Sequence, residues 1–210
     1  KRQQEGLSIK TGADTLFSEF LQTGLLYVQT ASSMIPAKVL GPDAGDHVLD
    51  MCAAPGSKTT HIAALMGNRG SIDAWDVYPH KVKLIKDNAK RLGISIIHTE
   101  VRDSVKPLPF LYETYDKVLL DAPCSGLGVL GHKVELRWRR KESDLSVFPP
   151  LQKQLIEQAA KYTKTGGVLV YSTCTLNPDE NEHIINEFLS LHSEFAPEEF
   201  NFPVLGKSLN

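Results

Sequence analysis

The chain has 210 residues, a length that fits one domain or one domain with an extension. Its hydrophobic fraction of 41% and charged fraction of 23% are those of an ordinary globular protein and exclude a disordered chain. The net charge of −2 is unusual for a protein that only coats nucleic acid, and no apolar run is long enough to span a bilayer.

The three cysteines, Cys52, Cys124 and Cys174, are odd in number and widely spaced. This pattern argues against a disulfide framework and favours a reduced, cytoplasmic setting. The sequence contains no C-x-x-C pair, so we expect neither a structural zinc site nor another bound metal.

Short β-like runs alternate with helical stretches along the chain. In chain order we predict a helix over Gln29–Ile35, strand His47–Met51, helix Thr59–Met66, strand Ser71–Asp76, helix His80–Leu92, strand Ile96–Val101, strand Lys117–Asp121, helix Leu151–Thr163, strand Val168–Ser172 and helix Glu180–Leu191. Gly166-Gly167 is expected to end the penultimate helix, and Asn177-Pro178-Asp179 to start the last one. This order predicts an α/β fold with a doubly wound, mostly parallel sheet.

The two ends of the chain are less regular than its middle. We assign residues 1–42 to an N-terminal extension and residues 43–210 to a single domain. Residues 196–210 are rich in Pro, Asn and Glu and show no clear strand, so we expect the sheet to lack its last edge strands.

A run of small residues, Asp50–Thr59, follows the first predicted strand and leads into a helix. Small residues let the backbone approach a ligand, and a helix N-terminus attracts anionic groups. Asp76 lies twenty residues after Gly56, the spacing of a carboxylate that binds ribose hydroxyls, and Asp103 could reach an adenine amino group. The alternative is that both are helix caps or loop residues. The spacing alone does not distinguish a nicotinamide cofactor from S-adenosylmethionine.

Two cysteines follow the fourth and fifth predicted strands. Asp121 and Cys124 lie in Asp-Ala-Pro-Cys-Ser-Gly, and Cys174 lies in Ser-Thr-Cys-Thr. If these strands are neighbours, both thiols and the carboxylate meet beside the cofactor, where a thiol can act as a nucleophile. The alternative is that both cysteines are small buried apolar residues. The polar turns rich in Gly, Pro, Ser and Thr favour the reactive interpretation.

Three motifs resemble those of the RNA 5-methylcytosine methyltransferases, the NOL1/NOP2/Sun family. They are Cys-Ala-Ala-Pro-Gly-Ser-Lys-Thr at 52–59, Asp-Ala-Pro-Cys-Ser-Gly at 121–126 and Ser-Thr-Cys-Thr at 172–175. Residues 24–33 and 177–182 also resemble segments of this family, so the resemblance covers about residues 24–195. Residues 75–84 and 127–130 are most similar to the bacterial RsmB/Sun type, which modifies small-subunit ribosomal RNA. The resemblance implies a Rossmann-like class I methyltransferase fold, S-adenosylmethionine as cofactor and RNA as partner.

The resemblance also implies roles for individual residues. Cys174 would attack carbon 6 of cytosine, Asp121 would bind the N3 edge of the base, Cys124 would assist proton removal or product release, and Lys58 would support the pocket near Asp121. DNA cytosine methyltransferases place their nucleophile in a Pro-Cys motif, which here would be Cys124, but the Thr-Cys motif favours Cys174. The residues expected to line the cofactor are Cys52, Ala53, Ala54, Pro55, Gly56, Ser57, Lys58, Asp76, Asp103 and Asp121.

The run Leu136–Lys141 contains Arg137, Trp138, Arg139 and Arg140. Cations beside an aromatic ring suit phosphates and stacked bases, so this run is a candidate RNA-binding segment. The alternative is a solvated charged loop with Trp138 packed on the core. The near-neutral net charge suggests that an N-terminal RNA-binding domain, as in RsmB-type proteins, supplies further affinity.

We expect a monomer that methylates small-subunit ribosomal RNA. A tRNA methyltransferase of the same family and a catalytically inactive RNA-binding or ribosome-assembly factor are alternatives, and the intact Asp121, Cys124 and Cys174 argue against the inactive factor. A nicotinamide oxidoreductase is a third alternative, and the absence of a G-x-G-x-x-G motif argues against it.

Overall fold

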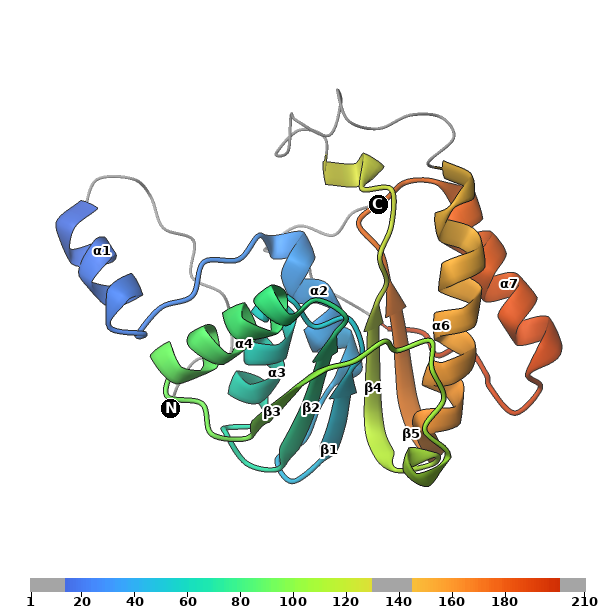
Figure 1. Cartoon of the computed structure of the whole chain (residues 1–210), viewed down its shortest axis with the longest axis horizontal. Coiled ribbons are helices and arrows are strands. Elements are labelled where there is room, and N and C mark those ends of the chain that lie inside the picture. Colours follow the sequence, from blue (N-terminus) through green and yellow to red (C-terminus); the bar gives the residue numbers. More distant parts are fainter. Residues whose placement is uncertain (1–13, 130–144, 201–210) are drawn as a thin grey trace.

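The computed structural model describes residues 14–129 and 145–200, with side chains from residue 18 onward. A five-stranded sheet in the order β3-β2-β1-β4-β5 forms its centre, and all neighbouring strands are parallel (Figure 1). The strands are β1 (His47–Asp50), β2 (Ser71–Asp76), β3 (Ile97–Val101), β4 (Tyr115–Asp121) and β5 (Thr163–Ser172). The α/β class and the parallel sheet are thus confirmed, as is the adjacency of the strands that carry the two cysteine motifs.

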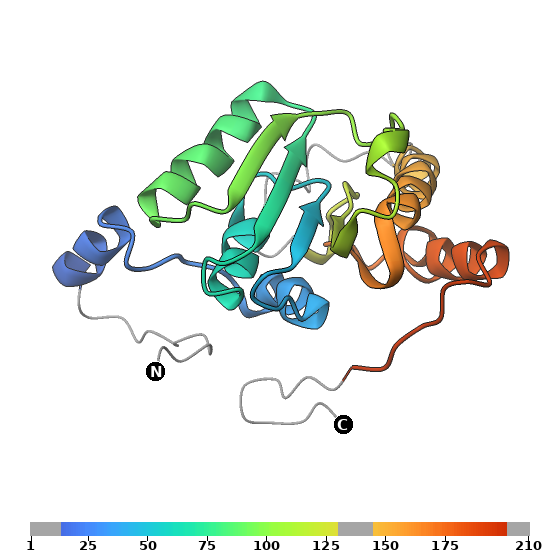
Figure 2. The same ribbon diagram turned by 90° about the horizontal axis from the view of Figure 1, so that it is seen from below.

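The helices lie between and around these strands. They are α1 (Asp14–Gln22), α2 (Ala31–Leu40), α3 (Ser57–Leu65), α4 (Pro79–Arg91), α6 (Phe148–Tyr162) and α7 (Glu182–Leu191), with short 3₁₀ turns η1 (Pro109–Leu111), η2 (Leu127–Val129) and η4 (Pro178–Glu180). Figure 2 shows α1 at one end of the molecule, beyond α4, and α7 at the other end.

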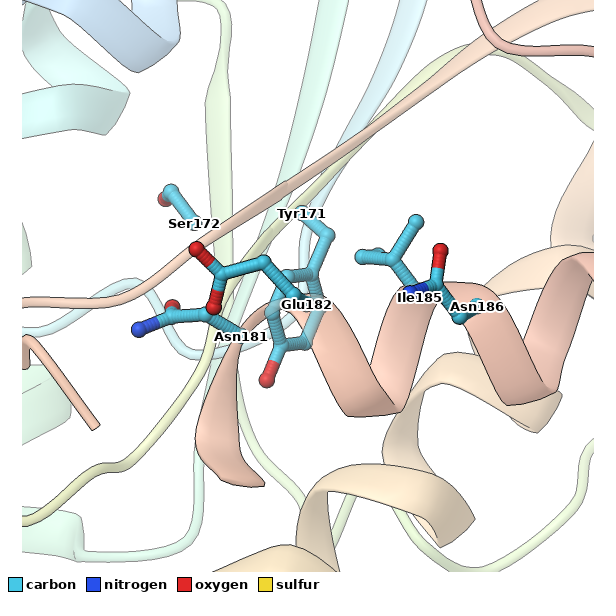
Figure 3. A pocket seen from close by; sticks show the side chains of 6 residues that line it. All are labelled: Tyr171, Ser172, Asn181, Glu182, Ile185 and Asn186. Carbon is cyan, nitrogen blue, oxygen red and sulfur yellow. The ribbon is translucent and has the colours of Figure 1, made fainter. Parts of the chain in front are cut away.

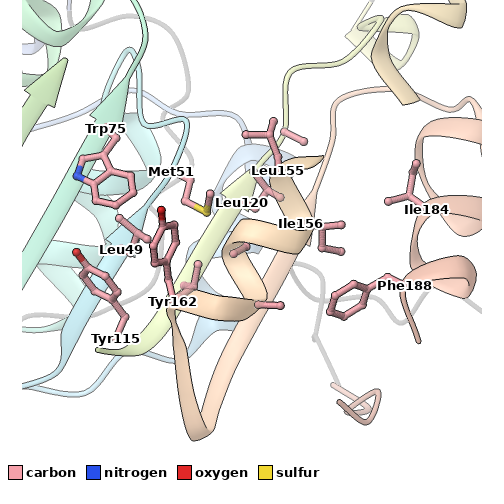
Figure 4. Packing of buried hydrophobic residues seen from close by; sticks show 14 residues of the cluster. Leu49, Met51, Trp75, Tyr115, Leu120, Leu155, Ile156, Tyr162, Ile184 and Phe188 are labelled. Carbon is pink, nitrogen blue, oxygen red and sulfur yellow. The ribbon is translucent and has the colours of Figure 1, made fainter. Parts of the chain in front are cut away.

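The sheet separates two hydrophobic clusters because successive side chains of a strand point to opposite faces. On one face Val48 and Leu119 pack with residues of α2 and α3. On the other face Leu49 and Leu120 pack with Trp75 and with residues of α6 and α7 (Figure 4). Burial on both faces explains why the central strands read as nearly continuous apolar runs.

Helix α2 differs from the predicted helix at both ends. It begins after Thr30, whose side-chain oxygen accepts from the backbone N–H of Ser33, and it continues through Pro36 to a left-handed Gly41. An N-cap and a left-handed C-cap are common helix boundaries. Its residues Ala37 and Leu40 are buried in the cluster beneath the sheet, so α2 packs as part of the same core.

The Gly166-Gly167 pair does not end α6, contrary to the prediction. The helix ends at Tyr162, and Thr163 already has an extended backbone, with its hydroxyl donating to the Ala159 carbonyl at 2.8 Å. The glycines lie inside β5, beside an irregularity in its pairing with β4. A Cβ at Gly167 would come within 2.9 Å of the Asp116 carbonyl oxygen, so close strand packing explains the glycine there.

Two further elements differ from the predictions. Asn177-Pro178-Asp179 starts the 3₁₀ turn η4, and α7 itself begins only at Glu182. Helix α1 was not predicted at all. Within residues 14–129 and 145–200, no helix combines the length and the apolar character needed to cross a membrane.

Candidate active site

The candidate site lies at the carboxyl ends of β1, β4 and β5. The chain leaves β1 toward α3 on one face of the sheet and leaves β4 toward α6 on the other face. In an open parallel sheet this change of direction between neighbouring strands creates the crevice where ligands bind. Three of the predicted segments, those after β1, β4 and β5, therefore meet at one edge (Figure 1).

The loop after β1 is shaped by a glycine at the start of α3. Gly56 has φ +98°, a left-handed conformation that favours glycine, and a Cβ there would lie 3.2 Å from the backbone of Ile85 in α4. This turn lets α3 begin at Ser57, two residues earlier than predicted. Lys58 and Thr59 consequently lie in the first turn of α3, facing the strand ends.

Asp50, the last residue of β1, is a buried carboxyl under this loop, with 1% of its surface exposed. Its Oδ2 accepts from the Thr59 hydroxyl at 2.7 Å, whereas its Oδ1 has no hydrogen-bond partner among the described residues. Burial raises the pKa of Asp50 to about 7, although the Thr59 bond acts in the opposite direction. An unsatisfied buried oxygen next to a glycine loop suits a ligand that brings a hydrogen-bond donor.

Asp76 and Asp103 lie near each other at the next strand ends. The backbone N–H of Arg102, which precedes Asp103, donates to the Asp76 carbonyl at 2.9 Å. Asp76 is buried and its Oδ1 accepts from the Tyr78 N–H at 3.0 Å, while Asp103 is half-exposed and its Oδ1 accepts from the Val105 N–H at 3.3 Å. β3 ends at Val101, so Asp103 stands in a turn after the strand. Each carboxylate thus accepts from the backbone N–H two residues further on, as loop residues commonly do, and both residues follow strands of the same sheet edge.

Asp121, the last residue of β4, is held by two side chains. Lys58 Nζ lies 2.6 Å from its Oδ2, and the Ser172 hydroxyl donates to its Oδ1 at 2.7 Å. Lys58 therefore lies where it was predicted, beside Asp121. Ser172 was part of a predicted motif but was given no role, and its position at the end of β5 explains how it reaches the carboxylate.

The two thiols lie in contact. Cys124 Sγ and Cys174 Sγ are 3.0 Å apart, and the Cys174 N–H donates to Cys124 Sγ at 3.2 Å. Cys174 is exposed and Cys124 is partly buried. The hydrogen bond with Cys174, followed by burial, raises the pKa of the Cys124 thiol far above its ordinary range. A raised pKa favours the protonated form of Cys124, in which its S–H can donate to the Cys174 sulfur.

Cys52 differs from these two cysteines. Its side chain packs against the core cluster that contains Leu49 and Trp75. Burial, reinforced by the negative charge of Asp50, raises the pKa of its thiol well above the ordinary value. A partly buried thiol with a raised pKa is a weak nucleophile, so Cys52 contributes packing and backbone to the loop.

A small cavity opens beside Asp121 on the side of α7. It has a volume of about 350 Å³ and is lined by Tyr171, Ser172, Asn181, Glu182, Ile185 and Asn186 (Figure 3). Ser172, which holds Asp121, thus also borders this cavity. Among the described residues, no group of three or more His, Cys, Asp or Glu side chains could hold a metal ion.

Sequence reasoning missed the buried polar contacts that join the two cysteine turns. Glu180 and Gln152 are both buried, and they contact the turn that contains Cys124. Glu180 lay in the quoted 177–182 segment, but Gln152 gave no signal because it is one polar residue in a helical run. The predicted RNA-binding residues Arg137, Trp138, Arg139 and Arg140 lie outside the described residues.

Comparison with known proteins shows the family to which the chain belongs. A protein-family model described as 16S rRNA methyltransferase RsmB/F matches residues 37–207. A protein of Bacillus subtilis named probable ribosomal RNA small subunit methyltransferase B is 43% identical over 86% of this chain and 41% of its own length. Mouse tRNA (cytosine(72)-C(5))-methyltransferase NSUN6 is 43% identical over 75% of this chain and 35% of its own length. The chain therefore spans about two-fifths of the length of such curated relatives.

Solved structures show the same fold and family. NSun6 from Pyrococcus horikoshii, solved with SFG, an analogue of S-adenosylmethionine, superposes with a TM-score of 0.77 at 38% identity. That match covers 87% of this chain and 46% of the other. An S-adenosylmethionine-dependent O-methyltransferase from Thermotoga maritima, at 18% identity and a TM-score of 0.57, shares the fold alone, with 82% of this chain and 56% of the other covered.

Proposed function

The chain belongs to the RsmB/F family of 16S rRNA methyltransferases, and we propose that it carries the site at which such an enzyme methylates carbon 5 of a cytosine in RNA. One observation carries the proposal: two thiols 3.0 Å apart lie at the ends of the neighbouring strands β4 and β5, beside an Asp121–Lys58 pair. A single thiol would suit many reactions. A thiol pair next to a carboxylate supplies both a nucleophile and a second acid–base group.

The cofactor of the family is S-adenosylmethionine, which supplies the methyl group as a sulfonium substituent. The residues present fit it, because the crevice offers Asp76 and Asp103 for hydroxyl and amino groups and an unsatisfied Asp50 oxygen beneath the loop. We propose that residues 52–58 contribute mainly backbone, since the thiol of Cys52 is directed to the core. Asp121 borders this crevice from β4.

Carbon 5 of cytosine is a poor nucleophile until a group adds to carbon 6. We propose that the Cys174 thiolate forms a bond to carbon 6, which places electron density on carbon 5 and leaves Cys174 covalently attached. Asp121, fixed by Lys58 and Ser172, faces the N3 edge of the base and holds a proton at N3, which neutralises the negative charge that reaches the ring as the adduct forms. After methylation, loss of the carbon 5 proton restores the ring double bond and expels the Cys174 sulfur.

Cys124 is suited to take that proton. In the free protein its hydrogen bond with Cys174 is the largest cause of its raised pKa. When Cys174 is bonded to carbon 6, its sulfur no longer competes for this proton, so the pKa of Cys124 falls, although burial still raises it. The second thiol thus becomes a base only once an adduct exists, which couples proton removal to the preceding step.

Substitution of each thiol tests this assignment. Cys174→Ala should abolish methyl transfer to RNA, because no adduct can form. Cys124→Ala should still form a covalent RNA adduct, which resolves slowly and survives denaturing electrophoresis. Cys52→Ala keeps both reactive thiols and should trap no adduct. An adduct that persists in Cys174→Ala and is absent in Cys124→Ala would reverse the roles.

We propose small-subunit ribosomal RNA as the substrate, in line with the family model and the Bacillus subtilis relative. A tRNA is the second candidate, because the mouse tRNA methyltransferase has the same 43% identity to this chain as the Bacillus subtilis relative, over 75% rather than 86% of the chain. Incorporation of labelled methyl into deproteinised 16S rRNA, compared with bulk tRNA, separates the two. Methylation of tRNA alone would contradict the proposed substrate, and methylation of neither would favour a catalytically inactive assembly factor.

We also propose that residues 136–141 bind RNA, and that the protein acts as a monomer in the cytoplasm. The three unbridged cysteines suit a reduced compartment. Reversal of charge at Arg137, Arg139 and Arg140 together should weaken RNA binding and flatten its dependence on salt. An unchanged dissociation constant for RNA would remove this segment from the interface.

A further inference from the structure

Glu180 is a fully buried carboxylate at the end of η4, with 0% of its surface exposed. Its Oε2 accepts from the Ser125 N–H at 2.8 Å and from Gln152 Nε2 at 3.1 Å, and its Oε1 accepts from Asn177 Nδ2 at 3.2 Å. Within the described part of the chain, no cation forms an ion pair with it. Burial of such a group is costly, and three N–H donors offset the cost.

The partners of Glu180 flank Cys124 on both sides. Ser125, the residue after Cys124, donates its backbone N–H directly to Glu180. Pro123, the residue before Cys124, accepts from Gln152 Nε2 at 2.9 Å, and the same Nε2 donates to Glu180. Gln152 is itself fully buried on α6. The Ser125 N–H and the Pro123 carbonyl, which flank Cys124 along the chain, are therefore fixed by the Glu180 carboxylate and the Gln152 amide.

Glu180 is also tied to the turn that carries Cys174. The Tyr171 hydroxyl, on β5, donates to the Glu180 carbonyl at 2.7 Å. The hydroxyls of Ser125 and Thr175, which follow the two cysteines, lie 2.7 Å apart in the interior. The two cysteine turns are thus joined directly by the Ser125–Thr175 contact, and the Glu180 carboxylate fixes the Ser125 backbone from which that contact is made.

We infer that Glu180, together with Gln152, is a positioning residue that holds the Cys124 thiol against Cys174. The inference rests on the proposed function, because contact between the thiols matters for resolving the RNA adduct. It goes beyond that function by assigning a role to two residues that touch neither the base nor the cofactor crevice.

A carboxylate is required at this position because all three partners donate. In Glu180→Gln an NH₂ group would face either the Ser125 and Gln152 donors or the Asn177 donor. Rotation of the Asn177 amide cannot relieve the second conflict without loss of another bond, because Asn177 Oδ1 accepts from the Asp179 N–H at 3.2 Å. At least one of the three bonds to this side chain must break although its volume is unchanged, and the bonds that remain lose the negative charge on their acceptor.

The first test needs no RNA and measures the contact between the thiols. Dibromobimane becomes fluorescent when two nearby thiolates each displace one bromide, so its rate of reaction reports the Cys124–Cys174 pair. In Glu180→Gln this rate should fall about tenfold, the effect of losing one charge-assisted hydrogen bond. Gln152→Met, which frees Pro123 but leaves the Ser125 bond, should show a smaller decrease. The matched control Glu187→Gln, an exposed glutamate of α7 paired with Lys153, should cross-link at the rate of the unsubstituted chain.

Thermal unfolding of each variant shows that the comparison is made between folded proteins. If Glu180→Gln does not fold, Gln152→Met decides the matter. Cross-linking at an unchanged rate in a folded Glu180→Gln, or in a folded Gln152→Met where Glu180→Gln does not fold, would overturn the inference.

The second test measures the RNA adduct in the same variants. Glu180→Gln should form the adduct at a rate within about twofold of the unsubstituted chain, but should resolve it about tenfold more slowly, as a milder form of Cys124→Ala. A merely structural role would slow formation and resolution equally, and that result would overturn the inference. If the unsubstituted chain methylates no RNA and Cys124→Ala traps none, the proposed function fails, while the cross-linking rates still decide the positioning role.

Discussion

Asp50 shows how one buried residue makes stability depend on pH. Its folded pKa of about 7 lies above its ordinary value of 3.8, so the folded chain holds a proton that the unfolded chain has released between these values. The stability associated with this carboxyl is fully present below pH 4 and is lost as the pH rises through 7. The cause is burial, which disfavours the ionised form.

We predict that Asp50→Asn removes this dependence. Between pH 4 and pH 7.5 the difference in unfolding free energy between the variant and the unsubstituted chain should change by roughly 2–4 kcal/mol in favour of the variant. Urea titrations without cofactor at several pH values measure it. Parallel pH profiles for the two proteins would contradict the proposed burial of a neutral Asp50.

At the scale of elements, the 3₁₀ turn η2 is packed against the Cys174 turn. The Gly128 N–H donates to the Cys174 carbonyl at 3.0 Å, and a Cβ at Gly128 would lie 2.9 Å from that oxygen. The contact is with backbone, so it cannot be relieved by rotation of a side chain. Glycine is needed at position 128 because the two backbones lie so close together. This contact fixes the position of the turn that contains Cys174.

We predict that Gly128→Ala displaces the Cys174 turn and lowers methyl transfer about tenfold or more, because small displacements of a nucleophile are costly. The affinity for S-adenosylmethionine should change little, since no residue of η2 is among those expected to line the cofactor. Single-turnover methylation and calorimetric cofactor binding measure the two quantities. Equal losses in both would show that the substitution disturbs the whole crevice.

The elements also show where the sequence was sufficient. The periodicity placed all five strands, and the alternation of strands with helices predicted the parallel sheet and the adjacency of β4 and β5. Contact between Cys124 and Cys174 and between Lys58 and Asp121 follows from that topology, because parallel strands bring their carboxyl ends to one edge. The residue types at those strand ends then made this edge of the sheet the candidate site.

What could not be predicted depends on three-dimensional packing. Gly166-Gly167 resembles a helix stop, yet α6 ends earlier because Thr163 turns into the sheet. The bond between Gln152 and Glu180 joins two helical regions separated by 28 positions, and no local pattern reveals such a partner. The sequence predicted that Asp103 lies near the crevice, but it could not predict the direction of its side chain, because Asp103 lies in a turn beyond β3.

At the scale of the whole molecule, the sheet is the rigid part of the structure that holds the candidate site. An apolar cluster covers each face of the sheet, so the core fixes the positions of the strand ends. The residues of the crevice stand on these strand ends and are therefore held in place. The proposed catalysis through a covalent adduct would need two thiols that stay in contact through several steps. The buried contacts between the cysteine turns provide this relation without a disulfide, which would block both sulfurs.

We propose that Cys174 forms the covalent bond to RNA while Cys124 resolves it. The most direct test is peptide mapping by mass spectrometry of the RNA adduct trapped in Cys124→Ala, after digestion by nuclease and protease. We expect a methylated cytidine nucleotide attached to the peptide that contains Cys174, with Cys52 unmodified. A nucleotide attached to any other residue, or no adduct in a variant that is folded and binds S-adenosylmethionine, would contradict it.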